Sequence, residues 1–289
     1  MMNIGVIGLG AVGLFIASSL AKRHEVTGYV RREEQANEIK DQGIIVDNSE
    51  TFVSVTTSQK FKEHDLIIIC TKQMAIDTLI PTLELVGRHT PILFLQNGQG
   101  HIEKIHHLPH PILLGVCEHG IVKIKDNEVS LKGLGKIRLG ALHKHHAELA
   151  VDISLALYQL DFPVKEHGSI TDVLNRKLIV NSVINPLTAI FNCRNGSIMT
   201  NDHLKYLAKK LTKEAAMTLN VDEDEAWERV RQVAEQTKEN YSSMLSDIQA
   251  KRQTEIDFIN GYILKKSSDF LPYQTNVYHM VKAKEGLRE

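Results

Sequence analysis

Cysteine is scarce in this chain, and its few cysteines lie far apart. Cys70, Cys117 and Cys193 are odd in number, and no two of them form a C-x-x-C pair. This pattern excludes a disulfide framework and a zinc-binding module of paired cysteines, and it is typical of a protein kept in a reducing cytoplasm.

The sequence also lacks a long hydrophobic run and an excess of charge of either sign. No stretch reaches the roughly 18 consecutive apolar residues expected of a membrane-spanning helix. Lysine plus arginine total 34 and aspartate plus glutamate total 35, so the net charge is −1. This balance excludes a surface devoted to nucleic acid or an anionic membrane, but it allows a small basic pocket for one phosphate.

Two further segments resemble a signal peptide and a metal site, but each lacks residues that such a feature requires. The apolar segment 4–20 has no basic stretch before it and contains four glycines, so it is not interpreted as a signal peptide. We therefore predict a soluble, cytoplasmic protein. His143, His145 and His146 have no helical i, i+4 pairing and no nearby carboxylates, so we predict a solvated surface there and no metal site.

The chain of 289 residues, 43% of them hydrophobic, is long enough for about two domains. Short apolar runs alternate with helical patterns in the first half, which predicts a parallel sheet covered by helices on both faces. Apolar runs at 129–131 and 137–139, with glycines between them, predict a hairpin that finishes this sheet. The other expected strands are 3–7, 25–30, 65–70 and 91–95, and the first expected helix is 11–22.

Strand signals largely stop after residue 164, and helical patterns follow. The acidic residues 222–225 are typical of a helix start, where negative side chains suit the positive end of the helix dipole. We therefore expect a Rossmann-type, doubly wound α/β domain over residues 1–166 and an all-α helical domain over 167–289. The expected helices of the second domain include 170–190, 203–219, 226–236 and 254–266.

A glycine-rich loop follows the first expected strand. Gly8, Gly10 and Gly13 have the G-x-G-x-x-G spacing, which allows a tight turn, close approach of a pyrophosphate, and close packing of helix on strand. Because this motif opens an apolar helix, it favours a dinucleotide-binding loop over a glycine-rich turn without a ligand. The residues expected to bind the cofactor here are Gly8, Leu9, Gly10, Ala11, Val12 and Gly13.

The end of the second expected strand indicates which dinucleotide is bound. NAD-binding proteins place an acidic residue there for the ribose hydroxyls, whereas this chain has Arg31 and Arg32. A guanidinium forks onto a phosphate, so the pair favours the 2′-phosphate of NADP(H). The alternative is that both arginines are solvated beside Glu33 and Glu34.

Two later strands are followed by polar residues, Lys72 and Asn97. Ligands of doubly wound sheets lie beyond the carboxyl ends of the strands, so either residue could meet cofactor or substrate, or simply cap a loop.

The expected helix over 170–190 carries a polar stripe. Lys177, Asn181 and Asn185 are spaced i, i+4, i+8 and therefore project from one side, among apolar neighbours. Such a stripe lines a cavity or finds polar partners, the alternative being an ordinary wet face. Pro186 frees the carbonyl of Ser182 and should bend or end the helix. Further along the chain, Ser242 and Ser243 could be a helix start or part of a site. Glu255 could be an ordinary exposed acid or part of a site.

Taken together, these residues resemble the ketopantoate reductase (2-dehydropantoate 2-reductase) family over essentially the whole chain. The resemblance implies a Rossmann domain and a helical substrate domain with the active site in the cleft between them. It also implies NADPH-dependent reduction of 2-dehydropantoate to (R)-pantoate, in pantothenate and coenzyme A biosynthesis. The motifs that carry it are residues 8–13, 71–72, 97–98, 177–181, 185–189, 195–196, 242–247 and 254–257.

The resemblance also implies roles for individual residues. Lys177 is expected to be the general acid, because the ketone oxygen gains negative charge as hydride arrives. Glu255 is expected to be a second catalytic residue, an acid that closes the cofactor–substrate site and holds either Lys177 or the substrate hydroxyl in place. The implied substrate ligands are Asn97, Lys177, Asn181, Asn185, Asn195 and Ser243, and the implied cofactor ligands outside the glycine loop are Arg31, Lys72, Asn97, Ile121 and Glu255.

Two other functions remain open from the sequence. A related hydroxy-acid dehydrogenase would use another keto acid, and a nucleotide-sensing protein would have the same fold with an inactive site. The expected assembly is a monomer or a homodimer.

Overall fold

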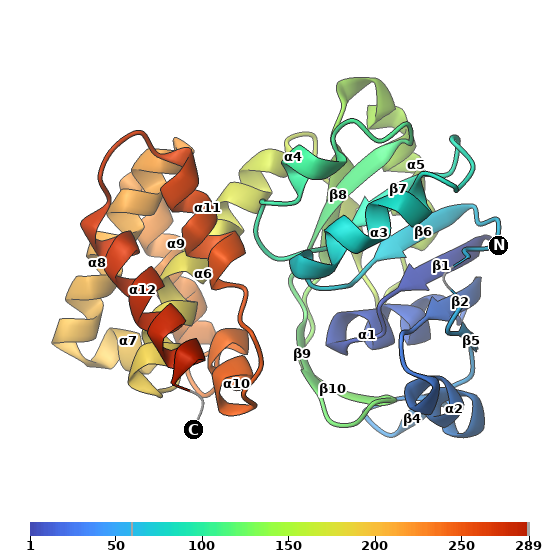
Figure 1. The fold of residues 1–289 in the computed structure, drawn as a ribbon, viewed down its shortest axis with the longest axis horizontal. Helices are drawn as coiled ribbons and strands as arrows, with labels where there is room; N and C mark the ends of the chain where they lie inside the picture. Colours follow the sequence, from blue (N-terminus) through green and yellow to red (C-terminus); the bar gives the residue numbers. More distant parts are fainter. Residues whose placement is uncertain (59, 288–289) are drawn as a thin grey trace. The chain divides into compact units, whose positions relative to one another are not determined.

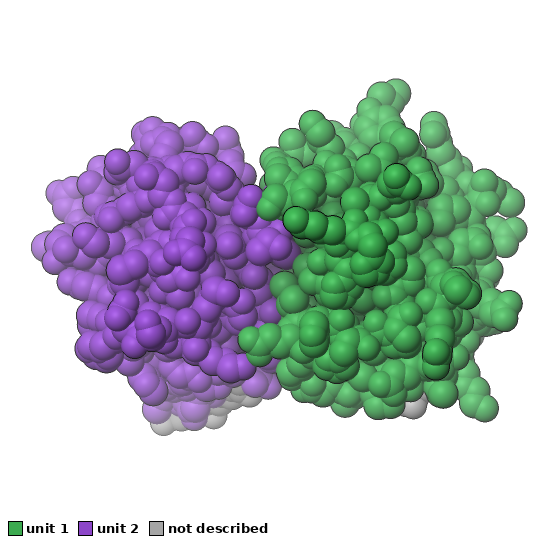
Figure 2. Space-filling model, turned by 90° about the horizontal axis from the view of Figure 1, so that it is seen from above, with its two compact units in different colours: residues 1–96, 101–170 green, residues 97–100, 171–289 purple. Residues whose placement is uncertain are grey.

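The computed structural model describes residues 1–58 and 60–287. The chain forms two compact units, coloured separately in Figure 2: Met1–Gln96 with His101–Ile170, and residues 97–100 with the chain from Thr171 onward. The domains proposed from the sequence, 1–166 and 167–289, differ from these units at residues 97–100 and 167–170.

The first unit is built on an eight-stranded sheet in the order β12-β11-β8-β7-β6-β1-β2-β5 (Figure 1). Its central strands are apolar and buried, as expected of a parallel sheet covered on both faces. Every pair is parallel except β11 with β8. The strands are Asn3–Ile7 (β1), Glu25–Tyr29 (β2), Ser54–Thr56 (β5), Leu66–Ile69 (β6), Ile92–Phe94 (β7), Ile112–Cys117 (β8), Ile137–Ala141 (β11) and Val164–Glu166 (β12).

Helices follow most of these strands, which confirms the predicted Rossmann-type fold. The first helix contributes Leu14, Ile16 and Leu20, all fully buried, to the core of the unit. The α-helices are Ala11–Leu20 (α1), Glu33–Gln42 (α2), Ile76–Leu83 (α3), Ile102–Ile105 (α4) and Ala147–Leu157 (α5), and the short 3-10 turns are Gln73–Ala75 (η1) and Lys144–His146 (η2).

The predicted hairpin over 129–131 and 137–139 is wrong. Glu128–Gly133 (β10) pairs with Gly120–Lys123 (β9) and with Ile44–Val46 (β3), in a separate four-stranded sheet completed by Ser49–Thr51 (β4). β11 joins the large sheet instead. Gly135, between the two runs, lies against the chain that follows β8, since a Cβ there would be 2.3 Å from the Glu118 carbonyl oxygen. The chain therefore turns at this point from β10 to β8, with which β11 pairs, instead of folding back on β10.

The second unit is helical, as predicted, and buries one apolar core. Asp222 caps the helix Glu223–Gln236, accepting a hydrogen bond from the Glu225 N–H at 2.9 Å, which confirms the predicted start. Sequence patterns had not indicated the helices α7 and α12, and they had left a helix start at Ser242 and Ser243, where α10 begins, as one alternative. The helices are Ile170–Phe191 (α6), Ser197–Thr200 (α7), Asp202–Leu219 (α8), Glu223–Gln236 (α9), Ser243–Gln249 (α10), Ile256–Lys266 (α11) and Pro272–Gly286 (α12).

Pro186 lies inside α6, which continues to Phe191 rather than ending at the proline. A proline has no N–H, so the Ser182 carbonyl loses its helical donor. The buried Asn260 of α11 donates to that carbonyl at 2.9 Å from its Nδ2 atom. The freed acceptor is therefore satisfied from a neighbouring helix.

Four buried histidines make the first unit sensitive to acid. Burial lowers the pKa of His64, His110 and His119, and it lowers the pKa of His101 to about 4. The unfolded chain therefore binds more protons than the folded one below about pH 6.5, and stability falls as the pH drops from there. At pH 5, His101 alone should remove about 2 kcal/mol from the free energy of unfolding.

Urea unfolding at pH 7.5 and pH 5.0 tests this expectation. The variant His101→Gln stays neutral throughout and should lose less stability than the parent over the same pH range. An identical loss in both proteins would contradict a neutral, buried His101.

Candidate active site

The glycine loop has the geometry that a bound pyrophosphate requires. Gly8 has φ +90°, and a Cβ at Gly13 would lie 2.0 Å from the Gly8 carbonyl oxygen, so both positions need glycine. At Gly10, by contrast, no atom of the described residues outside its chain neighbours lies within 4 Å of a Cβ position. No side chain caps α1, so the N–H groups of its first turn are open to an anion. These residues fit a dinucleotide.

The sheet register brings several predicted site residues to one edge. Ile7 pairs with Tyr29 and with Ile69, and Ile69 pairs with Phe94, so β1, β2, β6 and β7 end in one row. The glycine loop, Arg31 and Lys72 follow directly after the ends of β1, β2 and β6. Lys72 is exposed and precedes the turn η1.

The two arginines after β2 have different surroundings. Arg32 forms an ion pair with Asp126, whose other carboxylate oxygen lies 2.8 Å from Lys123 Nζ. Hydrogen bonds from Arg32 and Lys123 hold the pKa of Asp126 below its usual value. Arg31 is exposed, and its guanidinium has no acidic partner among residues 1–58 and 60–287. Of the two, Arg31 is the arginine whose charge is available to a phosphate.

Buried amide side chains support this edge, and sequence patterns did not indicate them. Gln35 Nε2 donates to the carbonyls of Leu9 and Asp126, both at 2.8 Å, which ties the glycine loop to the turn between β9 and β10. Gln96 Nε2 donates to the carbonyls of Ile69 and Thr71, both at 3.0 Å. Nothing in the residues around either glutamine marks it, so only the long-range contact reveals its role.

Ile121, one of the cofactor ligands that the resemblance implies, lies in β9. Its half-buried side chain packs against the apolar core of the first unit, and its backbone is opposite Leu131 of β10. The packing accounts for an apolar residue at this position.

Asn97 and Glu255 are 158 positions apart in the sequence and meet in the second unit. Asn97 Nδ2 donates to Glu255 Oε2 at 3.3 Å. Both side chains are half-buried. Glu255 occupies the position before α11 without capping that helix with its side chain. It is therefore not the ordinary exposed acid that the sequence left open.

The polar stripe of α6 lies among buried residues, as the sequence predicts. Leu178, Val183 and the other apolar neighbours are buried, whereas Lys177 and Asn181 are half-buried and Asn185 is 8% exposed. No described residue forms a hydrogen bond with the side-chain amide of Asn181 or Asn185. These two amides are therefore open to a ligand, on the same side of the helix as the Lys177 ammonium.

Asn195 and Ser243, the other two predicted substrate ligands of the second unit, lie outside α6. Asn195 is buried and donates from Nδ2 to Thr237 Oγ1 at 2.9 Å, while its Oδ1 is buried with no hydrogen-bond partner in the described chain. The helix-start role at α10 belongs to Ser242, whose Oγ accepts from the Leu245 N–H at 3.1 Å. Ser243 follows it in an exposed position, without a capping role.

The part of the chain that the structure describes has neither a membrane-spanning helix nor a cluster of metal-ligating side chains. None of the helices there combines the length and the apolar character that a bilayer crossing requires. No three histidine, cysteine, aspartate or glutamate side chains gather there as metal ligands.

An α/β unit whose glycine loop fits a dinucleotide, followed along the chain by a helical unit with a lysine–asparagine stripe, is the arrangement of a two-unit oxidoreductase. The family model of ketopantoate reductase PanE/ApbA matches residues 4–144, and the model of its C-terminal part matches residues 169–285. The chain belongs to the ketopantoate reductase family.

Individual relatives agree with this assignment. The 2-dehydropantoate 2-reductase of Bacillus subtilis is 40% identical over 274 residues, which cover 92% of this chain and 91% of that protein. The crystal structure of a probable 2-dehydropantoate 2-reductase from Bacillus subtilis is 38% identical, with a TM-score of 0.87 over 98% of this chain and 99% of that one. A D-mandelate dehydrogenase with NADH and anilino(oxo)acetate is 25% identical, with a TM-score of 0.92 over 99% of both chains.

Proposed function

We propose that this protein is a 2-dehydropantoate 2-reductase that uses NADPH to reduce the C2 ketone to the hydroxyl of (R)-pantoate. The lysine–asparagine stripe of α6 carries the proposal, since it places one ammonium beside two amides that form no side-chain hydrogen bond with residues 1–58 and 60–287. A small keto acid needs those groups: a proton donor for the ketone oxygen and neutral donors for hydroxyl and carboxylate. The full-length similarity to reductases of this substrate supports the same reaction.

The cofactor half of the proposal rests on the glycine loop and on Arg31. The first-turn N–H groups of α1 would hold the pyrophosphate, and the exposed Arg31 would pair with the 2′-phosphate. Lys72, Asn97, Ile121 and Glu255 remain proposed cofactor contacts. When bound, NADPH supplies the hydride that reduces C2.

In the proposed mechanism, this chain's own residues orient the substrate and provide the proton. Lys177 stabilises the negative charge that develops on the ketone oxygen and protonates it, which completes the alcohol. The amides of Asn181, Asn185 and Asn195 bind the substrate's polar groups without adding charge, and Ser243 donates to the carboxylate. The Asn97–Glu255 pair, joined at 3.3 Å, closes the site around the reacting carbon.

A different keto acid is the second candidate substrate. The D-mandelate dehydrogenase structure favours it, because that enzyme shares the fold over 99% of both chains and is seen with NADH. In that case the same lysine would protonate the ketone of an aromatic keto acid, and Arg31 would have no 2′-phosphate to bind.

A spectrophotometric assay distinguishes the two. Purified protein should oxidise NADPH only when 2-dehydropantoate is added, with one pantoate formed per NADPH consumed. Its kcat/KM should exceed the values for phenylglyoxylate and 2-oxoisovalerate, and NADPH should be preferred to NADH. A higher kcat/KM for another keto acid would identify the second candidate, and turnover with none of them would contradict a reductase.

The cellular location and the assembly of the protein remain predictions. We expect a cytoplasmic protein that is a monomer or a homodimer. Size-exclusion chromatography with light scattering tests the expected assembly.

A further inference from the structure

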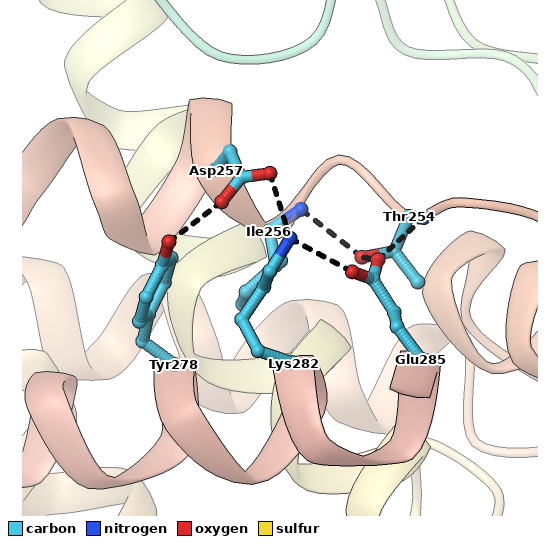
Figure 3. Close-up of polar contacts among 6 residues, drawn as sticks. All are labelled: Thr254, Ile256, Asp257, Tyr278, Lys282 and Glu285. Atoms are coloured by element: carbon cyan, nitrogen blue, oxygen red, sulfur yellow. Dashed lines mark hydrogen bonds and ion pairs between the residues drawn. The ribbon is translucent and has the colours of Figure 1, made fainter. Parts of the chain in front are cut away.

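Three side chains of α12 hold the segment that contains Glu255 (Figure 3). Glu285 Oε1 accepts two hydrogen bonds from Thr254, one from the backbone N–H at 2.8 Å and one from the hydroxyl at 2.7 Å. Lys282 Nζ lies 3.0 Å from Glu285 Oε2 and 3.1 Å from Asp257 Oδ2. The Tyr278 hydroxyl donates to Asp257 Oδ1 at 2.7 Å.

The spacing along α12 makes this arrangement possible. Tyr278, Lys282 and Glu285 are four and three residues apart, so they lie on one face of the helix. Glu285 is 8% exposed and Thr254 is fully buried. Burial by itself would raise the pKa of Glu285, but the hydrogen bonds from Thr254 and the Lys282 ammonium bring it below its ordinary value. Glu285 is therefore a buried carboxylate, and its acceptor atoms are committed to these partners.

These contacts fix the backbone on both sides of Glu255. Before it, Thr254 is bound through its N–H and its hydroxyl, and that hydroxyl also accepts from the Ile256 N–H at 3.2 Å. After it, Asp257 is bound by Tyr278 and Lys282. Glu255 lies between these anchored residues, and its carboxylate accepts from Asn97 Nδ2. The direction of the Glu255 side chain therefore depends on neighbours that α12 anchors.

We propose that Glu285 is a positioning residue: through Thr254 it sets the direction in which Glu255 presents its carboxylate to the reacting groups. This inference rests on the proposed function, because it needs Glu255 to act in the reduction. A buried acid with this role sits outside the motif 254–257 and would not contact substrate or cofactor.

Single variants give the first test. Glu285→Ala should lower kcat on the order of 10- to 100-fold, since small displacements of a catalytic group are costly. Glu285→Gln keeps one oxygen for the two Thr254 donors and should stay within about fivefold of the parent. The KM for NADPH should change less than kcat, because the glycine loop and Arg31, the proposed contacts of the pyrophosphate and the 2′-phosphate, belong to the other unit. The matched control is Asn276→Ala, which changes an exposed side chain of the same helix outside this cluster, and it should keep the parent's kcat.

A double-mutant cycle separates positioning from a general loss of stability. With Glu255→Gln already present, adding Glu285→Ala should lower kcat no further, because the two residues act as one unit. If Glu285→Ala does not yield folded protein, Thr254→Val replaces it in the cycle, because it removes the hydroxyl that donates to Glu285 and accepts from the Ile256 N–H but keeps the backbone N–H donor. Fully additive losses, or a Glu285→Ala variant with parental kcat, would overturn the positioning role while leaving the proposed function intact. Parental turnover by Glu255→Gln would overturn both the catalytic role of Glu255 and the positioning role with it.

Discussion

Lys177→Ala should lower kcat for 2-dehydropantoate on the order of 1000-fold, the middle of the range for loss of a general acid. The ketone oxygen would still gain negative charge as hydride arrives, but no ammonium would stabilise or protonate it. The KM for NADPH should stay near the parent value, because the glycine loop is untouched. Steady-state NADPH oxidation at saturating keto acid measures this effect.

Arg176 provides the matched control for this variant. It is the preceding residue of α6, also cationic, and its guanidinium pairs with Glu225 on the exposed side of the unit. Arg176→Ala removes one positive charge from the same turn and should leave kcat within about twofold, since an exposed ion pair contributes little. Equal losses in the two variants would contradict a specific role for the Lys177 ammonium.

Arg31→Ala should raise the KM for NADPH by about 10-fold or more and leave the KM for NADH nearly unchanged. A charge-assisted hydrogen bond from the guanidinium to the 2′-phosphate is worth about 1.5–3 kcal/mol, and NADH has no such phosphate. Initial rates with each cofactor, at fixed 2-dehydropantoate, give the two KM values. In the parent, the KM for NADPH should be lower at low salt than at high salt, and this difference should disappear in Arg31→Ala.

Arg32→Ala distinguishes this role from a general need for positive charge after β2. Because Arg32 is already paired with Asp126, its removal should change the KM for NADPH by no more than about twofold. Should Arg31→Ala weaken NADPH and NADH equally, the 2′-phosphate contact would be wrong. A larger effect from Arg32→Ala would transfer that contact to Arg32.

Local patterns predicted the elements that form the sheet edge. The glycine loop was recognisable because Gly8 and Gly13 each meet a steric demand within a few residues: a positive φ and a 2.0 Å approach to backbone. The stripe on α6 was recognisable because helical periodicity alone places its three residues on one side. Both signals come from residues close together in the chain.

Contacts between distant segments could not be predicted in this way. The run at 129–131 has the alternation of a strand, but nothing within it shows that its partners are β9 and β3 rather than β11. Gln35 and Glu285 are ordinary polar residues on helices until the fold brings them to Leu9 and Thr254. Likewise, the proline in α6 is tolerated because Asn260, 74 positions further along the chain, supplies the missing donor.

A crystal structure of the protein with NADP⁺ and pantoate tests the central role of Lys177 most directly. The proposed mechanism predicts that its Nζ atom lies within about 3.2 Å of the C2 hydroxyl oxygen, the distance at which a proton is passed. A Lys177 side chain that points into bulk water, out of hydrogen-bond reach of that oxygen, would contradict it.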